Sequence, residues 1–223
     1  MTAIGDRSVT DPAPPTIRSP LGPAILAVGL ALAAVIVGLV LPDGTSRKGA
    51  GTGAMTHYMG LLAANQPWNL LLFMAIPVIL AETLAITELA LLFRPDLPRT
   101  VHALNRWAGL VAGVWFTGIV AYLTVNAALP LTTGGGWRGI GDLVAVGAYL
   151  LGIVPLGGIT LIELGVLGTG SERDRTKLHA VFVGIFLVIA HVAMIFGMLD
   201  PSLLGFHPSH VMPDGGSMPG MNM

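Results

Sequence analysis

Five long apolar segments, several of which contain ionisable residues, constrain this chain more strongly than any other feature of its sequence. The segments are Leu21–Leu41, Trp68–Phe93, Trp107–Leu129, Asp142–Leu167 and Leu178–Leu199. A helix that crosses the hydrocarbon core of a bilayer needs about 20 apolar residues, and each segment is long enough. Hydrocarbon offers no water to backbone N–H and C=O groups, so each segment is expected to be helical. The sequence therefore predicts an all-α integral membrane protein, an antiparallel helix bundle with five transmembrane helices.

The composition supports a membrane protein and excludes several kinds of chemistry. Hydrophobic residues make up 53% of the chain and charged residues only 10%, whereas a soluble domain has about 25% charged residues. The net charge of -1 gives no reason to expect a nucleic-acid partner. The chain has no cysteine, which excludes disulfides, iron–sulfur clusters and thiolate zinc sites. It also lacks the motifs of ATP-driven transport and of serine-triad hydrolysis.

The expected organisation has four parts. Residues 1–20 are polar and rich in proline, and they are expected to be a disordered cytoplasmic N-terminus. Residues 21–41 form the first membrane helix, 55–199 a four-helix core, and 200–223 an extracytoplasmic tail rich in Met and His. An alternative start at Met55 would yield the core alone.

The positive charges predict the orientation. With the N-terminus inside, eight of the eleven Lys and Arg residues lie on the inner side, as the positive-inside rule requires. We therefore expect a multi-pass protein of the bacterial inner membrane whose C-terminus is extracytoplasmic.

Small residues predict where the helices pack closely. Gly109, Gly113 and Thr117 recur at every fourth position, a spacing that lets helix backbones approach one another. Pro155 lies in the middle of the fourth span beside Gly157 and Gly158, so a kink is expected there.

One set of ionisable residues is expected to form a layer in the inner half of the membrane. Glu82 lies 14 residues after Trp68, which places it about 21 Å from the outer end at ~1.5 Å per residue. The predicted layer consists of Glu82, Glu88, Glu163, His102 and His179. An ionised group in hydrocarbon normally faces protein, water or a metal, so the layer is a candidate proton-coupling or second metal site. A structural alternative pairs Glu88 with Arg94 or Arg99.

A second set, in the outer half and outside the membrane, has the side chains that copper prefers. His191, Met194 and Met198 share one face of the last helix, and His57 precedes the second helix on the same side. The tail adds His207, His210, Met212, Met218, Met221 and Met223. Imidazole and thioether together suit copper, especially the reduced ion. The leading hypothesis is therefore a membrane protein that binds and handles a transition metal, with copper as the metal that these donor types favour. Methionines at helical spacing also occur as packing residues of a hydrophobic core.

Two other functions fit the same residues. His57 and His191 lie towards the outer side and His102 and His179 towards the inner side, so two histidine pairs at two depths could ligate haem b. Such a protein would exchange electrons with a quinone or a partner enzyme. Alternatively, the buried polar groups only fix helix register in an accessory subunit that binds other membrane subunits or copies of itself in the lipid bilayer.

Three stretches of sequence carry a family resemblance. They are Met55-Thr-His-Tyr-Met-Gly-Leu-Leu, then Gln66-Pro-Trp-Asn-Leu, then Ala81-Glu-Thr-Leu-Ala-Ile-Thr-Glu88. In these the chain resembles a family of small bacterial membrane proteins of unknown function, whose members are loosely labelled permeases. The resemblance covers Met55 to Leu199, with the first helix and the tail as additions. It implies a membrane bundle and supplies no functional residues.

Overall fold

The computed structural model describes residues 21–42, 55–168 and 171–206, which form an all-α bundle without a strand in these ranges. In chain order the elements are α1 (Leu21–Val40), α2 (His57–Ala63), α3 (Trp68–Leu70), the π-helical segment η1 (Leu71–Ala75), α4 (Ile76–Phe93), α5 (Arg99–Leu123), the π-helical segment η2 (Thr124–Ala128), α6 (Leu129–Thr133), α7 (Gly139–Leu151), α8 (Ile153–Glu163), α9 (Glu172–Met198) and the short 3-10 helix η3 (Pro201–Leu204).

In the part of the chain that the structure describes, five continuous helical stretches are long and apolar enough to cross a membrane. They are Leu21–Val40, Trp68–Phe93, Arg99–Thr133, Gly139–Glu163 and Asp174–Met198. The prediction of an all-α bundle with five membrane-crossing helices is therefore confirmed. The third stretch begins eight residues before the predicted Trp107, because the polar turns of α5 around His102 and Arg106 continue the helix beyond its apolar part.

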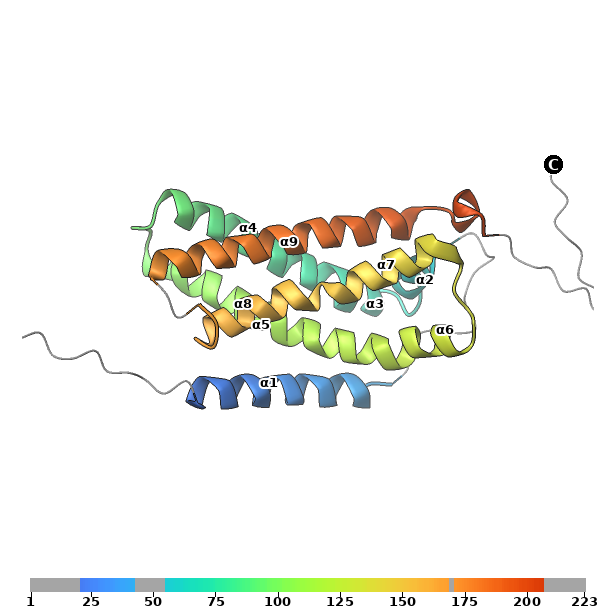
Figure 1. Cartoon of the computed structure of the whole chain (residues 1–223), viewed down its shortest axis with the longest axis horizontal. Helices are drawn as coiled ribbons and strands as arrows, with labels where there is room; N and C mark the ends of the chain where they lie inside the picture. The colour runs from blue at the N-terminus through green and yellow to red at the C-terminus, as the bar shows by residue number, and fades with distance from the viewer. Residues whose placement is uncertain (1–20, 43–54, 169–170, 207–223) are drawn as a thin grey trace, which may run out of the picture.

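The last four crossing stretches form a closed ring. α5 packs on α4 and on α8, while α9 packs on α4 and on the α7–α8 stretch. α1 lies against α5 on the outside of this ring (Figure 1). Neighbours in sequence are neighbours in space, as expected for an antiparallel bundle with short connections.

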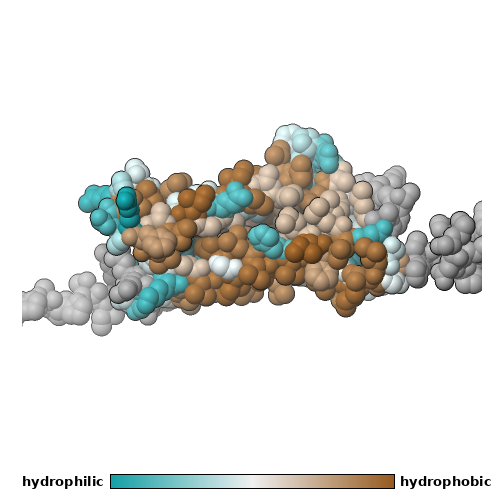
Figure 2. Space-filling view, turned by 90° about the horizontal axis from the view of Figure 1, so that it is seen from above, coloured by the Kyte–Doolittle hydropathy of each residue, from teal (hydrophilic) through white to brown (hydrophobic). Residues whose placement is uncertain are grey.

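The two ends of the bundle differ in charge. α4 ends, α5 begins, α8 ends and α9 begins at one end (Figure 1). This end carries the basic side chains Arg94, Arg99, Arg106, Arg175 and Lys177, and we call it the basic end. Between the ends, the face in Figure 2 is mainly hydrophobic, with small hydrophilic patches within it. The chain is a multi-pass membrane protein.

Glycines let α5 and α8 approach closely. A Cβ atom at Gly113 would lie 2.6 Å from the carbonyl oxygen of Leu156, and one at Gly109 would lie 2.8 Å from Cγ2 of Ile159. Both distances are too short for real carbon contacts, so only glycine fits. The predicted close packing at these two positions is confirmed.

The fourth span is interrupted where the sequence predicts a kink. α7 ends at Leu151 and α8 begins at Ile153, with Gly152 between them. Pro155 has no N–H to donate to Leu151, the residue four positions before it, which explains a break at this point.

Candidate functional site

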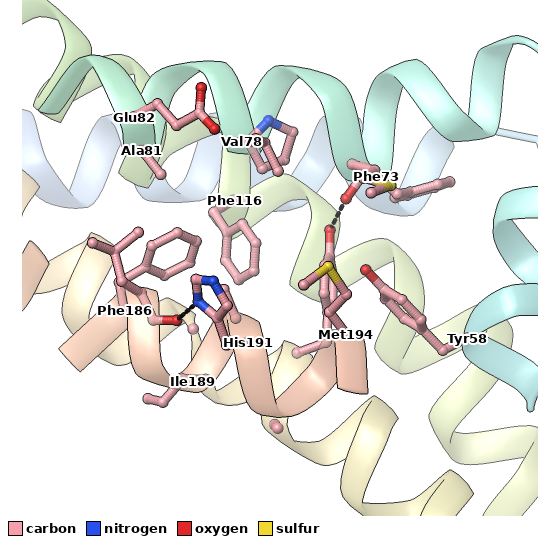
Figure 3. Close-up of a pocket in the computed structure, with 17 residues that line it drawn as sticks. Tyr58, Phe73, Val78, Ala81, Glu82, Phe116, Phe186, Ile189, His191 and Met194 are labelled. Carbon is pink, nitrogen blue, oxygen red and sulfur yellow. Dashed lines mark hydrogen bonds between the residues drawn. The ribbon is translucent and has the colours of Figure 1, made fainter. Parts of the chain in front are cut away.

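A cavity of about 230 Å³ lies between α4 and α9. Its walls are mostly aliphatic and aromatic, and polar atoms come from only a few side chains of the described residues, notably Glu82, His191, Tyr58 and Tyr149. Glu82 lies on α4 and His191 lies on the facing helix α9 (Figure 3). Both residues are exposed in the bundle, so the cavity opens between these two helices towards the surrounding lipid.

The ring of His191 is held in one tautomer by its own helix. Its Nδ1 atom lies 2.6 Å from the carbonyl oxygen of Leu187, one turn earlier (Figure 3). A carbonyl oxygen can only accept, so Nδ1 must carry the hydrogen of the neutral ring. The lone pair is therefore on Nε2. Histidines that ligate metals usually donate their other ring N–H in this way, often to a backbone carbonyl.

Two thioethers line the same cavity. Met194 follows His191 by three residues on α9, and Met74 comes from η1 at the start of the second span. Met198, which the sequence places on the same face, is 69% exposed and does not line the cavity. Of the two methionines that the sequence groups with His191, only Met194 therefore lines the cavity. Met74, which was not among the predicted ligands, lines it as well.

Tyr58 closes the cavity on the side of α2. Its ring packs against that of Tyr149, with ring centroids 5.5 Å apart. Burial raises the pKa of the Tyr58 phenol, so this hydroxyl stays neutral at physiological pH.

The donors in the cavity are soft rather than acidic. In residues 21–42, 55–168 and 171–206, no group of three His, Cys, Asp or Glu side chains is arranged to hold a metal ion. The cavity instead offers one imidazole and two thioethers, with Glu82 as the one carboxylate. Imidazole and thioether are ligands that suit Cu(I).

A second polar cluster lies nearer the basic end and is buried between four helices. The ring of His179 on α9 lies between two carboxylates, with Nδ1 in close contact with Oε1 of Glu88 on α4. On the other side of the ring, Nε2 lies 3.3 Å from Oε1 of Glu163, the last residue of α8. The side chains of His179 and Glu88 are only 3% and 6% exposed. These contacts are ion-pair contacts by distance, although neither ring nitrogen meets hydrogen-bond geometry.

α5 completes this cluster. Nδ2 of Asn105 donates to Oε1 of Glu88 and to Oγ1 of Thr87, at 2.9 Å in each case. The exposed Arg106 places its Nε atom 3.9 Å from Oε2 of Glu163. Asn105 was not selected from the sequence, because an amide near the end of a helix is too common to stand out.

Only part of the predicted inner layer comes together. Glu88, Glu163 and His179 meet, and Glu88 contacts His179 and Asn105 rather than Arg94 or Arg99. Glu82 on α4 instead lines the cavity to which His191 on α9 also belongs. His102 is exposed on the first turns of α5.

His57 belongs to a third cluster, at the end opposite the basic end. It is the first residue of α2, and its Nδ1 lies 2.5 Å from Oδ2 of Asp142. The other carboxylate oxygen accepts the backbone N–H of His57 at 2.6 Å. Asp142 is fully buried in the first turn of α7 and also accepts the backbone N–H of Arg138. In the sequence, Asp142 stands at the predicted start of the fourth span and marks only a helix boundary.

The predicted tail ligands cannot be placed. His207, His210, Met212, Met218, Met221 and Met223 lie outside the described residues.

A comparison with known protein families matches residues 53–213 to a family of unknown function (DUF6803). The match covers well over half of the chain. The chain belongs to this family. Neither a search of curated proteins nor a search of solved structures finds a match.

The family match agrees with the resemblance seen in the sequence and refines its bounds. It begins just before Met55 and leaves α1 outside. At the other end it continues past Leu199 to residue 213 and so includes His207, His210 and Met212, which the sequence analysis had treated as an addition to the core.

Proposed function

We propose that this member of DUF6803 is a membrane protein that binds and handles a transition metal, most specifically Cu(I), in the cavity between α4 and α9. The observation that carries the proposal is the hydrogen bond from His191 Nδ1 to the Leu187 carbonyl oxygen. It leaves the Nε2 lone pair for a ligand and fixes the ring orientation, as in the outer shell of known metal sites.

The neighbours of His191 support copper over other metals. Met194 and Met74 line the same cavity, and thioethers bind Cu(I) far better than they bind Mg²⁺ or Ca²⁺, which prefer oxygen ligands. The apolar walls favour an ion of low charge with soft ligands. Glu82 at the mouth is the proposed second ligand or proton-coupling carboxylate.

The wider scheme adds collection outside the membrane. In it, the Met- and His-rich tail collects copper at the extracytoplasmic side of a bacterial inner membrane. His57 would assist this collection only if Asp142 releases its ring, because the ring is paired with that carboxylate. We extend the same proposal in two ways. The protein would move copper across the membrane, as a permease does, and it would associate with other membrane subunits or with copies of itself.

The haem alternative has less support than the copper proposal. His57 and His179 both have ring nitrogens against carboxylates, so ligation of iron would first require these contacts to break. In the inner pair, His102 is exposed on the first turns of α5, whereas His179 on α9 is buried between Glu88 and Glu163.

The proposal is tested by titrating the purified full chain with Cu(I) against a chromophoric chelator. We expect His191→Leu and Met194→Leu each to remove one bound copper, or to weaken it at least about tenfold. The matched control is Met198→Leu, which changes the same side chain one turn further along α9 but outside the cavity. Copper bound by the Met- and His-rich tail is the same in every variant, so it does not affect the difference between them. Equal loss in the control, or no loss in the His191 variant, would refute the proposed site.

A further inference from the structure

The Glu88–His179–Glu163 cluster has a geometry that the proposed copper site does not use. The three side chains belong to three different helices, and the imidazole separates the two carboxylates. The two ring nitrogens point in different directions, so the two carboxylates cannot share one metal ion with the ring between them. A ring placed in this way can instead accept a proton on one nitrogen and release one from the other.

The burial of the cluster increases from Glu163 to Glu88. The side chain of Glu163 is 13% exposed and lies beside Arg106, whose side chain is 63% exposed at the basic end. His179 and Glu88 are almost fully buried, and Oε2 of Glu88 has no hydrogen-bond partner. Charged groups buried in a membrane bundle are costly and commonly mark proton relays.

We propose that Glu163, His179 and Glu88 form a reversible proton relay that stores one proton on Glu88, taken from water at the basic end. Glu163 takes a proton from a hydronium ion at the basic end, which leaves a neutral water molecule. Glu163 then passes this proton to Nε2 of His179, while the hydrogen on Nδ1 moves to a carboxylate oxygen of Glu88. The ring is neutral before and after the transfer, Glu163 is again ionised, and Glu88 has become a neutral acid. The reverse sequence of transfers resets the ring.

Other groups around the ring tune the relay without carrying the proton. Asn105 donates to Oε1 of Glu88, the oxygen that also contacts Nδ1 of His179, and so it positions the oxygen that receives the stored proton. From α5, Arg106 favours the ionised form of Glu163. On α9 itself, Arg175 donates to the Ile162 carbonyl oxygen one turn before His179 and adds a second positive charge at this end.

The relay is tested by the rate at which the ring protons of His179 exchange with water. The measurement uses ¹⁵N-histidine-labelled full chain in lipid nanodiscs, with the His179 signals identified by their loss in His179→Gln. We expect ring protons of the unaltered chain to exchange much faster than the backbone N–H of the buried neighbour Val183. A purely structural ion pair would keep them as protected as that amide, and this result would overturn the proposal.

Two variants then test whether protons reach His179 through Glu163, apart from any general effect of losing a carboxylate at this end. Glu163→Gln removes the group that receives protons from water, and we expect it to slow ring exchange at least tenfold. Asp96→Asn removes an exposed carboxylate at the same end and is expected to leave the rate unchanged. Equal rates in Glu163→Gln and the unaltered chain would contradict the relay. Neither result bears on copper binding at His191, so this proposal and the copper proposal fail independently.

Discussion

The hydroxyl of Tyr149 donates to the carbonyl oxygen of Phe73 across 2.5 Å, and so joins α7 to η1 beside the cavity. In a regular α-helix the residue four positions after Phe73 would donate to this carbonyl, but that residue is Pro77. Proline has no N–H, so the side chain of Tyr149 supplies the missing donor. The buried hydroxyl of Tyr149 thus satisfies a backbone carbonyl of a neighbouring helix.

Removing this hydroxyl should destabilise the bundle. We expect Tyr149→Phe to lower the free energy of unfolding by about 1–3 kcal/mol, because the Phe73 carbonyl loses a buried donor. The ring contact with Phe116 stays in place, since Phe retains the ring. Reversible unfolding in detergent measures the change, and an unchanged unfolding free energy would show that the hydrogen bond contributes nothing.

The contact between α5 and α8 should tolerate no added carbon at Gly113. We expect Gly113→Ala to cost about 1–3 kcal/mol of stability, as overpacking usually does. Gly157→Ala on α8 is the matched control, because a Cβ atom there would meet nothing within 4 Å. If thermal unfolding shows the two variants to be equally stable, the packing described here is wrong.

The carboxylate of Asp142 should hold the N-terminus of α2. In Asp142→Ala the backbone N–H groups of His57 and Arg138 lose their acceptor, and the His57 ring loses its partner. We expect amide hydrogen exchange in residues 57–63 to become about tenfold faster, which corresponds to ~1.4 kcal/mol of local stability. Exchange in α9 near Ile185 serves as the internal reference, and equal acceleration there would indicate general loosening instead.

Met74 should contribute to copper binding, although no pattern in the sequence singles it out. We expect Met74→Leu to weaken Cu(I) binding by about tenfold or more, because one thioether ligand of the cavity is lost. Met59→Leu is the matched control, since Met59 on α2 packs against the core without lining the cavity. Competition with a chelator measures both affinities, and equal affinities would remove Met74 from the site.

Much of the fold could be predicted from the sequence, because hydrocarbon imposes one strong rule on every spanning segment. Helices in all five apolar stretches, and close packing at Gly109 and Gly113, followed from length and spacing alone. The polar turns at the start of α5 could not be predicted as helix in this way. The requirement that a segment in hydrocarbon be helical applies only to its apolar residues.

The partners of the ionisable residues were harder to predict. Helical spacing gives the depth and face of a residue but not which helix it faces. Glu82 and Glu88 were therefore grouped, whereas the structure places Glu82 in the wall of the cavity and Glu88 against His179. Asp142 was missed because a carboxylate in a first helical turn usually marks only a helix start. Its role depends on α2, a short helix that the sequence did not predict.

The most direct test of copper handling is the metal content and absorption spectrum of one detergent-purified sample of the full chain, measured beside His191→Ala. We expect about one copper that the substitution removes, in addition to any copper held by the tail, and no Soret band. A Soret band lost on substitution would establish haem ligation and contradict the copper site. Copper content that is the same in both proteins would contradict the assignment of His191 as a ligand.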